Sequence, residues 1–148
     1  MTVTSGDVFV DTNVLVYARD AAVQAKQARA ADWMAFLWRS GRGRTSVQVL
    51  SEFYTTVTRR LKPGLDAISA RHETEQIMLW DPVAISTGVV RRAWRLQDRY
   101  SVSFWDALIV SAAQIAGCDY LLTEDLQEGQ DFGGVVVVGP FLHAPGEV

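Results

Sequence analysis

Residues 8–17 read VFVDTNVLVY, and this stretch decides the fold class. Val8–Val10 is a β-branched and aromatic run, which is typical of a short buried strand. Asp11, Thr12 and Asn13 follow at once. Their short polar side chains favour the start of a helix, with Thr12 or Asn13 as the expected cap. A strand that passes directly into a helix predicts the first unit of an α/β domain.

The same alternation of short apolar runs and longer amphipathic segments continues along the chain. Apolar spacing and capping residues predict helices at residues 22–40, 45–61, 66–78, 86–99 and 103–116. Apolar runs predict further strands at residues 83–85, 120–122 and 135–138, and residues 41–44 are expected to form a basic loop. Short strands separated by helices indicate a parallel sheet, so we expect residues 1–148 to form one α/β domain.

The composition is that of an ordinary globular protein, with 49% hydrophobic and 21% charged residues in a chain of 148. No apolar run approaches the roughly 20 residues that span a bilayer, so no membrane association is expected. The first residues, MTVTSGD, lack the features of a signal peptide. Cys118 is the single cysteine, which excludes an internal disulfide and favours the cytoplasm.

The charges are unevenly distributed. All 14 lysines and arginines lie between Arg19 and Arg99, whereas residues 101–148 carry seven acids and no base. The basic residues cluster at 39–44, 59–62 and 91–99. Each cluster has two interpretations, a solvated helix face or a phosphate-facing rim beside an acidic pocket.

Four acids stand where strand or helix ends would direct them to one place: Asp11, Glu52, Asp106 and Asp125. Each alone has a structural alternative. Asp11 could be a turn or cap residue, and Glu52 could be an exposed helix glutamate. Asp106 could close a capping box that begins at Ser103, although its apolar neighbours predict a nearly buried first turn. Together, the four carboxylates predict a site for a divalent metal, because buried charges require compensation.

The segments DTNVLVY, SEFY, SFWDALIV and LLTEDLQEG, in this order, resemble the PIN-domain nucleases, and specifically the VapC-type ribonuclease toxins of toxin–antitoxin pairs. The ending DFGGVVVVGPF is also similar, so the resemblance covers essentially the whole chain. It implies a three-layer α/β/α domain with a short-stranded parallel sheet. It also implies that Asp11, Glu52, Asp106 and Asp125 form an acidic metal site, with Asn13 and Thr123 as polar supports.

The chemistry that fits is metal-assisted hydrolysis of RNA. Mg²⁺ prefers oxygen ligands and binds through a few carboxylates, and we expect Mn²⁺ to substitute for it. Asp11 and Asp106 are the expected direct ligands. Glu52 and Asp125 could bind a second ion, orient water or act from the outer shell. Whether Glu124 or Glu128 assists Asp125 stays open.

Two other functions remain alternatives. A Mg²⁺-binding receiver-like signalling module also gathers aspartates at a sheet edge, but it needs a lysine after a late strand, and no lysine follows Lys62. A catalytically idle, RNA-binding PIN-like module would not need the complete set of acids. The resemblance further implies a cognate antitoxin and a homodimer as partners.

The remaining aromatic and apolar residues carry weaker expectations. The five tryptophans are expected mostly in the core, with Trp38 as a candidate for exposure, and Cys118 is expected to pack beside a strand. Apolar helix positions exceed what a thin sheet needs, and they are the expected surface for self-association: Trp33, Leu37, Phe53 and Val57.

Overall fold

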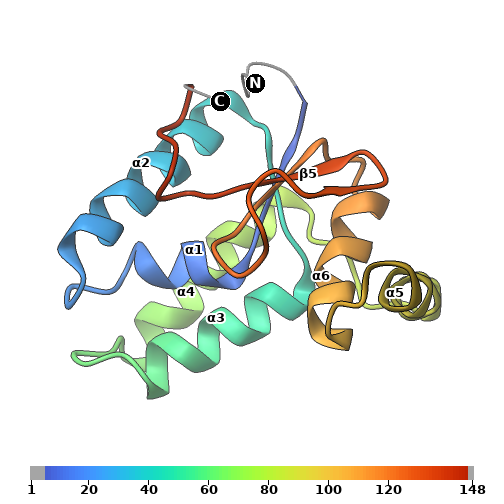
Figure 1. Cartoon of the computed structure of the whole chain (residues 1–148). Helices are drawn as coiled ribbons and strands as arrows, with labels where there is room; N and C mark the ends of the chain where they lie inside the picture. The colour runs from blue at the N-terminus through green and yellow to red at the C-terminus, as the bar shows by residue number, and fades with distance from the viewer. Residues whose placement is uncertain (1–5, 147–148) are drawn as a thin grey trace.

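The computed structural model of the chain describes residues 6–146, so the expectation for the first residues falls mainly outside the described part. The chain combines strands and helices, as the sequence predicts, but residues 47–115 form helices without an intervening strand (Figure 1). The strands are β1 (Val8–Val10), β2 (Gly43–Arg44), β3 (Tyr120–Leu122), β4 (Asp131–Phe132) and β5 (Val135–Val138). The helices are α1 (Thr12–Tyr17), α2 (Gln24–Ser40), α3 (Val47–Arg59), α4 (Ala67–Ile77), the short 3₁₀ helix η1 (Met78–Trp80), α5 (Thr87–Tyr100) and α6 (Phe104–Ile115).

The described strands form one sheet in the order β2-β1-β3-β5-β4, in which only the β4–β5 pair is antiparallel. In the central pair, Val8 lies opposite Tyr120 and Val10 opposite Leu122. Helix α2 lies on one side of the sheet, and α5 and α6 lie on the other (Figure 1). The central strands β1, β3 and β5 are largely buried because helices cover both faces, which is the expected three-layer α/β/α arrangement.

Serine and aspartate side chains begin most of the helices. Ser46, Asp66, Ser86 and Ser103 each accept a hydrogen bond from the backbone N–H three residues later. These caps confirm the predicted helix starts near residues 46, 66, 86 and 103. The expected cap of α1, Thr12 or Asn13, was wrong. The cap is Asp11, which accepts from the Thr12 N–H, so the alternative interpretation of Asp11 as a cap residue is confirmed.

Two short segments differ from the prediction. Residues 41–44 are not entirely a loop, because Gly43 and Arg44 pair with β1 as strand β2. Residues 83–85 do not form a strand, since only Val83 makes a bridge, to Ser46. The sheet gains β4 instead, which was not predicted. Glycine at position 43 has a packing reason, because a Cβ there would lie 2.5 Å from the Trp80 ring.

The core explains the apolar helix positions without a second copy of the chain. Trp33, Leu37, Phe53 and Val57 are all buried within the domain, since α2 and α3 turn these faces inward. The expectation that these residues form a surface for self-association was therefore wrong. Apolar positions at helical spacing cannot show whether a helix packs on its own sheet or on another chain.

The tryptophans divide in a way that the sequence did not predict. Trp33 and Trp80 belong to the core, whereas Trp38, Trp94 and Trp105 are 41%, 53% and 65% exposed. Exposure of Trp38 was expected, but that of Trp94 and Trp105 was not.

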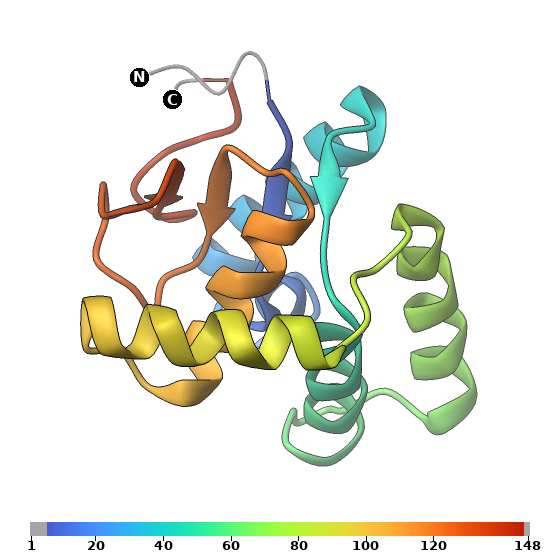
Figure 2. The same ribbon diagram turned by 90° about the vertical axis from the view of Figure 1, so that its right-hand side faces the viewer.

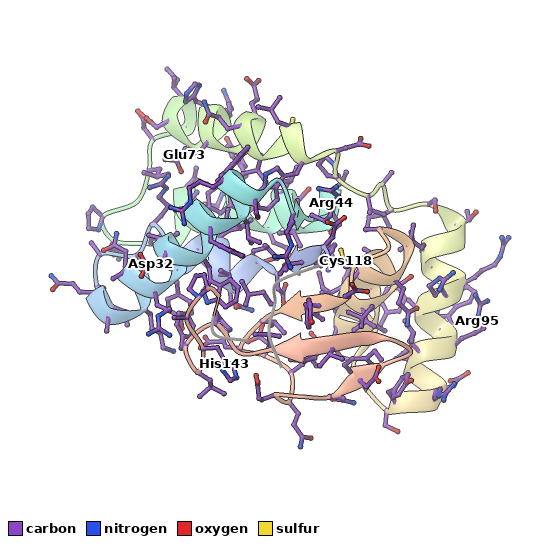
Figure 3. The ribbon with its side chains drawn as sticks, turned by 90° about the horizontal axis from the view of Figure 1, so that it is seen from above. Asp32, Arg44, Glu73, Arg95, Cys118 and His143 are labelled. Carbon is purple, nitrogen blue, oxygen red and sulfur yellow. The ribbon has the colours of Figure 1, made fainter. Side chains whose placement is uncertain are left out.

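Cys118 is buried just before β3, close to Arg44 at the amino-terminal edge of the sheet (Figure 3). Burial raises the pKa of its thiol to about 12, so its interpretation as a packing residue is supported. Within residues 6–146, no helix is both long enough and apolar enough to cross a membrane.

Candidate active site

The ends of β1 and β3 place two polar residues next to each other. Asp11 follows β1 directly and Thr123 follows β3 directly, and the register that pairs Val10 with Leu122 makes them neighbours. The Thr123 hydroxyl donates to Asp11 Oδ2 at 2.8 Å, and the Asp11 N–H donates to the Leu122 carbonyl at 3.1 Å. The parallel pairing of these strands therefore fixes the position of the Asp11 carboxylate at the carboxyl edge of the sheet.

Asn13 connects Asp11 to the segment that follows β3. Its amide nitrogen lies 3.0 Å from Thr123 Oγ1, 3.1 Å from Asp125 Oδ2 and 3.3 Å from Asp11 Oδ2. The Thr123 hydroxyl also accepts from the Asp125 N–H at 3.0 Å, and Asn13 Oδ1 accepts from the Glu124 N–H. This hydroxyl uses its one donor and two acceptor positions, so the network leaves it fully satisfied.

Burial makes the Asp11 carboxylate costly to ionise. The residue is only 6% exposed, and this burial raises the pKa of its carboxyl from 3.8 to about 7. The hydrogen bonds from Thr123 and the Thr12 N–H act in the opposite direction, while the negative charges of Asp125 and Glu52 raise the pKa further. A cation at this position would offset the cost of the buried charge.

Asp125 has a similar but weaker perturbation. Partial burial raises the pKa of its carboxyl, and the Asn13 amide lowers it. The charges of Glu124, Asp106 and Glu52 also raise it. Asp125 thus lies within electrostatic reach of Asp106 and Glu52, and Asp11 lies within reach of Asp125 and Glu52. Asp125 is the acid that connects Asp106 to the other predicted acids.

Glu52 reaches the site from α3. Its side chain is exposed, and its Oε2 accepts a 2.7 Å hydrogen bond from the Thr12 hydroxyl. Its Oε1 accepts from the Gln48 amide at 3.0 Å. The bond from Thr12 joins α3 to α1 across the site. This role of Thr12 was not predicted from the sequence, although Thr12 stands between Asp11 and Asn13 and carries a hydroxyl.

Asp106 lies in the first turn of α6, and this turn is more open than predicted. Asp106 is only partly buried and Trp105 is largely exposed, because α6 begins at the rim of the domain. Ser103 caps the helix by accepting from the Asp106 N–H at 3.1 Å. Within the described part of the chain, the Asp106 carboxylate itself makes no hydrogen bond or ion pair, so it does not complete a capping box.

The acids interact electrostatically but do not form a complete set of metal ligands. Among residues 6–146, no three histidine, cysteine, aspartate or glutamate side chains are close enough to form a ready-made metal site. The donors that surround the cluster are nevertheless carboxylate, amide and hydroxyl oxygens, which suit a hard divalent cation. Two acids are held on the sheet, and two reach in from separate helices.

Glu124 and Glu128 are engaged elsewhere. Glu124 accepts from the Lys26 ammonium at 2.9 Å, and it affects Asp125 only through its charge. Glu128 bonds to His143 Nε2 at 2.6 Å and to the Gly139 N–H. Glu128 therefore connects to the segment after β5. Because both of its carboxylate oxygens are used there, Glu128 does not assist Asp125.

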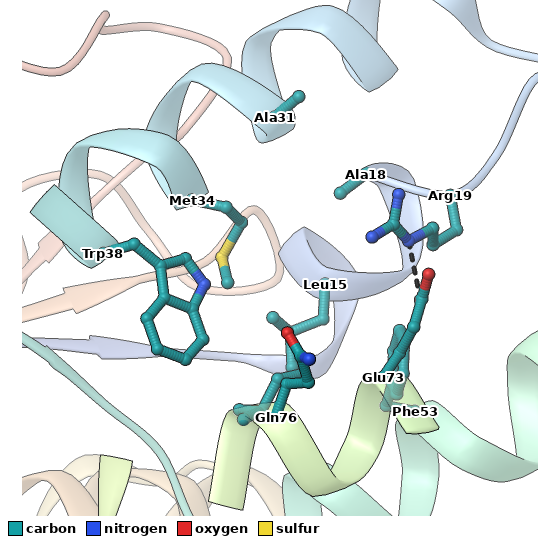
Figure 4. A pocket seen from close by; sticks show the side chains of 10 residues that line it. Leu15, Ala18, Arg19, Ala31, Met34, Trp38, Phe53, Glu73 and Gln76 are labelled. Atoms are coloured by element: carbon teal, nitrogen blue, oxygen red, sulfur yellow. Dashed lines mark hydrogen bonds and ion pairs between the residues drawn. The ribbon is translucent and has the colours of Figure 1, made fainter. Parts of the chain in front are cut away.

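An open cleft of about 640 Å³ runs beside Glu52 and Asp125, between α1, α3 and the segment after β3, and neither Asp11 nor Asp106 lines it. It is lined by Thr12, Asn13, Val16, Tyr17, Asp20, Ser51, Glu52, Thr55, Thr56, Arg60, Glu124 and Asp125. A separate cavity of about 240 Å³ lies on another face of α1, between α1, α2 and α4 (Figure 4). The ion pair between Arg19 and Glu73, at 2.7 Å, lies at this cavity, which contains none of the four acids.

A PIN-domain family model matches residues 8–127. The chain therefore belongs to the PIN-domain family. The match includes all four predicted acids as well as Asn13 and Thr123. No curated protein sequence matches the chain.

Several solved structures share the fold. Mycobacterium tuberculosis VapC20, described as a sarcin–ricin loop cleaving toxin, is 23% identical with a TM-score of 0.57, over 78% of this chain and 87% of that one. A toxin–antitoxin complex from Klebsiella pneumoniae is 18% identical with a TM-score of 0.57, over 90% of this chain and 98% of that one. FitAcB from Neisseria gonorrhoeae is 15% identical with a TM-score of 0.62, over 90% of this chain and 98% of that one. At these identities, the likeness shows a common fold.

Proposed function

We propose that this PIN-domain protein is a metal-dependent endoribonuclease that hydrolyses RNA phosphodiester bonds and acts as the toxin of a toxin–antitoxin pair. The observation that supports the proposal is the electrostatic coupling of Asp125 to Asp11, Glu52 and Asp106, next to an open cleft that Glu52 and Asp125 line. The buried carboxylate of Asp11, which the charges of Asp125 and Glu52 also disfavour, favours cation binding more than a single exposed acid would.

Asp11 and Asp106 would hold Mg²⁺ or Mn²⁺ directly, and Glu52 and Asp125 would bind a second ion or act from the outer shell. When bound, the ion supplies positive charge to the scissile phosphate and lowers the pKa of a water molecule. Asn13 and Thr123 keep the carboxylates of Asp11 and Asp125 oriented.

The proposed biological role follows from the structural neighbours, two of which are described as a toxin and a toxin–antitoxin complex. An antitoxin would keep the nuclease inactive until it is released. We also propose a homodimer, whose surface must differ from the buried residues expected from the sequence. The cytoplasm is the compartment that would bring RNA, antitoxin and Mg²⁺ together.

The two alternative functions make different predictions. A receiver-like module requires a late lysine, which this chain lacks, and membership of the PIN family also counts against it. An idle RNA-binding PIN-like module would bind RNA without cleaving it. Only an assay of cleavage separates this module from an active nuclease.

The test is incubation of the purified protein with total cellular RNA and Mg²⁺ or Mn²⁺, with and without a chelator, followed by mapping of the cut sites. We expect cleavage that the chelator stops and that Asp11→Asn and Asp106→Asn each reduce by more than about 100-fold, since even outer-shell changes cost 10–100-fold. Asp98→Asn is the matched control, because Asp98 is exposed on α5 outside the site. Cleavage by Asp11→Asn at the wild-type rate would overturn the proposal.

A further inference from the structure

We propose that Arg60 binds a phosphate of the RNA backbone that neighbours the scissile phosphate. This inference rests on the proposed ribonuclease function and deepens it. Among the described residues, Arg60 is the single arginine or lysine that lines the cleft beside the acids. A phosphate-facing role was one of two interpretations of the basic cluster at residues 59–62, and the structure distinguishes the members of that cluster.

The cleft needs a positive charge if it is to accept RNA. Its other charged lining residues are acids: Asp20, Glu52, Glu124 and Asp125. Glu124 is neutralised by Lys26, but the remaining acids would repel an RNA backbone. Divalent cations held by the predicted acids would compensate the scissile phosphate, so a neighbouring phosphate in the same cleft would need a partner of its own.

Arg60 is available for this contact. Its side chain is exposed, and no carboxylate in residues 6–146 lies within ion-pair distance of it. A guanidinium presents several donors in a planar fork that matches the oxygens of a phosphate. The unpaired guanidinium therefore loses no existing ion pair when RNA enters.

The wall of the cleft connects Arg60 to the acids. Glu52 lies on α3 and Arg60 caps its carboxyl end, eight residues further on, which corresponds to about 12 Å along a helix axis. Thr55 and Thr56 line the cleft between them. Hydroxyl groups are common ligands of phosphate and sugar oxygens, so this wall offers a continuous polar track. An RNA strand that follows α3 would thus leave the acids and reach Arg60.

Other arginines do not share this position. Arg44 pairs with Asp7 at 3.3 Å, and Arg42 donates to the Gly6 carbonyl, both at the amino-terminal edge of the sheet. These contacts count against the phosphate-facing interpretation of residues 39–44. Arg59, the last residue of α3, is exposed like Arg60 but is not among the described residues that line the cleft. Arg59 therefore provides a control of equal charge one position away.

The first experiment measures binding of a fluorescent single-stranded RNA 12-mer in chelator, so that no cleavage occurs, at several salt concentrations. We expect Arg60→Ala to weaken binding by roughly threefold to tenfold at low salt. We also expect it to reduce the slope of log K against log salt by about 0.7, the value for one phosphate contact on a single strand. Arg60→Lys should keep most of the slope, and Arg59→Ala should leave affinity and slope close to wild type.

The second experiment places one uncharged methylphosphonate linkage at successive positions of the RNA. In wild type, an uncharged linkage at one position near the cleavage site should weaken binding. In Arg60→Ala the same linkage should cause no further loss, because the contact between Arg60 and that phosphate is already absent. Equal losses in Arg59→Ala and Arg60→Ala, or additive effects at every linkage, would overturn the role of Arg60. If wild type cleaves no RNA, the proposed function itself fails, and with it this inference. If wild type cleaves but Arg60→Ala binds and cleaves equally well, only the inference fails.

Discussion

The two halves of the acidic site are built in different ways. The sheet half, Asp11 with Asn13, Thr123 and Asp125, lies at the ends of β1 and β3 and is joined by hydrogen bonds of 2.8–3.3 Å. The helix half consists of Glu52 on α3 and Asp106 on α6, both more accessible to solvent than Asp11. The helix half comes from two separate helices, α3 and α6 (Figures 1 and 2). The hydrogen bonds of the sheet half form without an ion, whereas the Asp106 carboxylate has no partner among the described residues.

The two halves also differ in the free-energy cost of ionising their carboxylates. Burial of Asp11 makes its ionised form unfavourable, and the hydrogen bonds from Thr123 and Thr12 offset only part of the penalty. The carboxylate of Asp106 is less buried, and it has no hydrogen-bonding partner among the described residues. Changes in the sheet half should therefore alter the stability of the metal-free protein, and removal of the Asp106 carboxylate should change it little.

The largest expected effect is on the pH dependence of stability. Because the folded pKa of Asp11 is about 7 and its ordinary value is 3.8, the folded protein binds more protons than the unfolded chain between these values. Stability of the metal-free protein should therefore fall as pH rises from about 4 to about 7, by at most about 4 kcal/mol for a shift of this size. Asp11→Asn should remove most of this fall.

Urea unfolding in chelator, from pH 4 to pH 8, measures the effect in wild type and in Asp11→Asn. Asp125 leaves a smaller residual slope in both, because its pKa is also raised. Parallel pH profiles for the two proteins would show that Asp11 carries no such penalty.

A smaller loss is expected from the hydroxyl at the centre of the sheet half. Thr123→Val keeps the shape of this buried side chain but leaves the Asp11 carboxylate, the Asn13 amide and the Asp125 N–H without their shared partner. We expect a cost of about 1–3 kcal/mol in unfolding free energy. The exposed Thr55→Val should stay within about 0.5 kcal/mol of wild type. Equal stabilities for the two variants in chemical denaturation would contradict the importance of the network.

The smallest expected effect is that of Asp106 on the metal-free protein. Asp106→Ala should change unfolding free energy by no more than about 0.5 kcal/mol, since its carboxylate makes no contact within the described residues. Ser103→Ala should cost about 0.5–2 kcal/mol, because Ser103 is the residue that caps α6. Thermal and urea unfolding in chelator compare the two. A loss in Asp106→Ala as large as that in Ser103→Ala would restore the capping-box interpretation.

Much of the fold could be predicted because local signals agree with tertiary structure. Val8–Val10, Tyr120–Leu122 and Val135–Val138 are apolar runs buried on both faces, and caps such as Ser86 and Ser103 mark helix starts. Strands β2 and β4 could not be predicted, because each has only two residues and is defined by its pairing with a neighbour. Periodicity also cannot say what a helix packs against, which is why the proposed surface for self-association was wrong.

The site was partly predictable for a similar reason. Carboxyl ends of parallel strands share one edge of a sheet, so the approach of Asp11 to the segment of Asp125 follows from the order of the elements. The exposure of Asp106 and Trp105 depends on where α6 meets the rim of the domain, and no local pattern encodes that. The bond between Thr12 and Glu52 joins residues 40 positions apart, and it becomes visible only in three dimensions.

Thermal unfolding near neutral pH, with and without Mg²⁺ or Mn²⁺, tests most directly whether an ion joins the two halves. We expect the metal to raise the unfolding midpoint of wild type and of the Asp98→Asn control in a concentration-dependent way, since a ligand of the folded state stabilises it. The midpoint of Asp106→Asn should rise much less, although we expect this variant to be as stable as wild type without metal. No shift in wild type, or an equal shift in Asp106→Asn, would contradict a metal site shared by the sheet and helix halves.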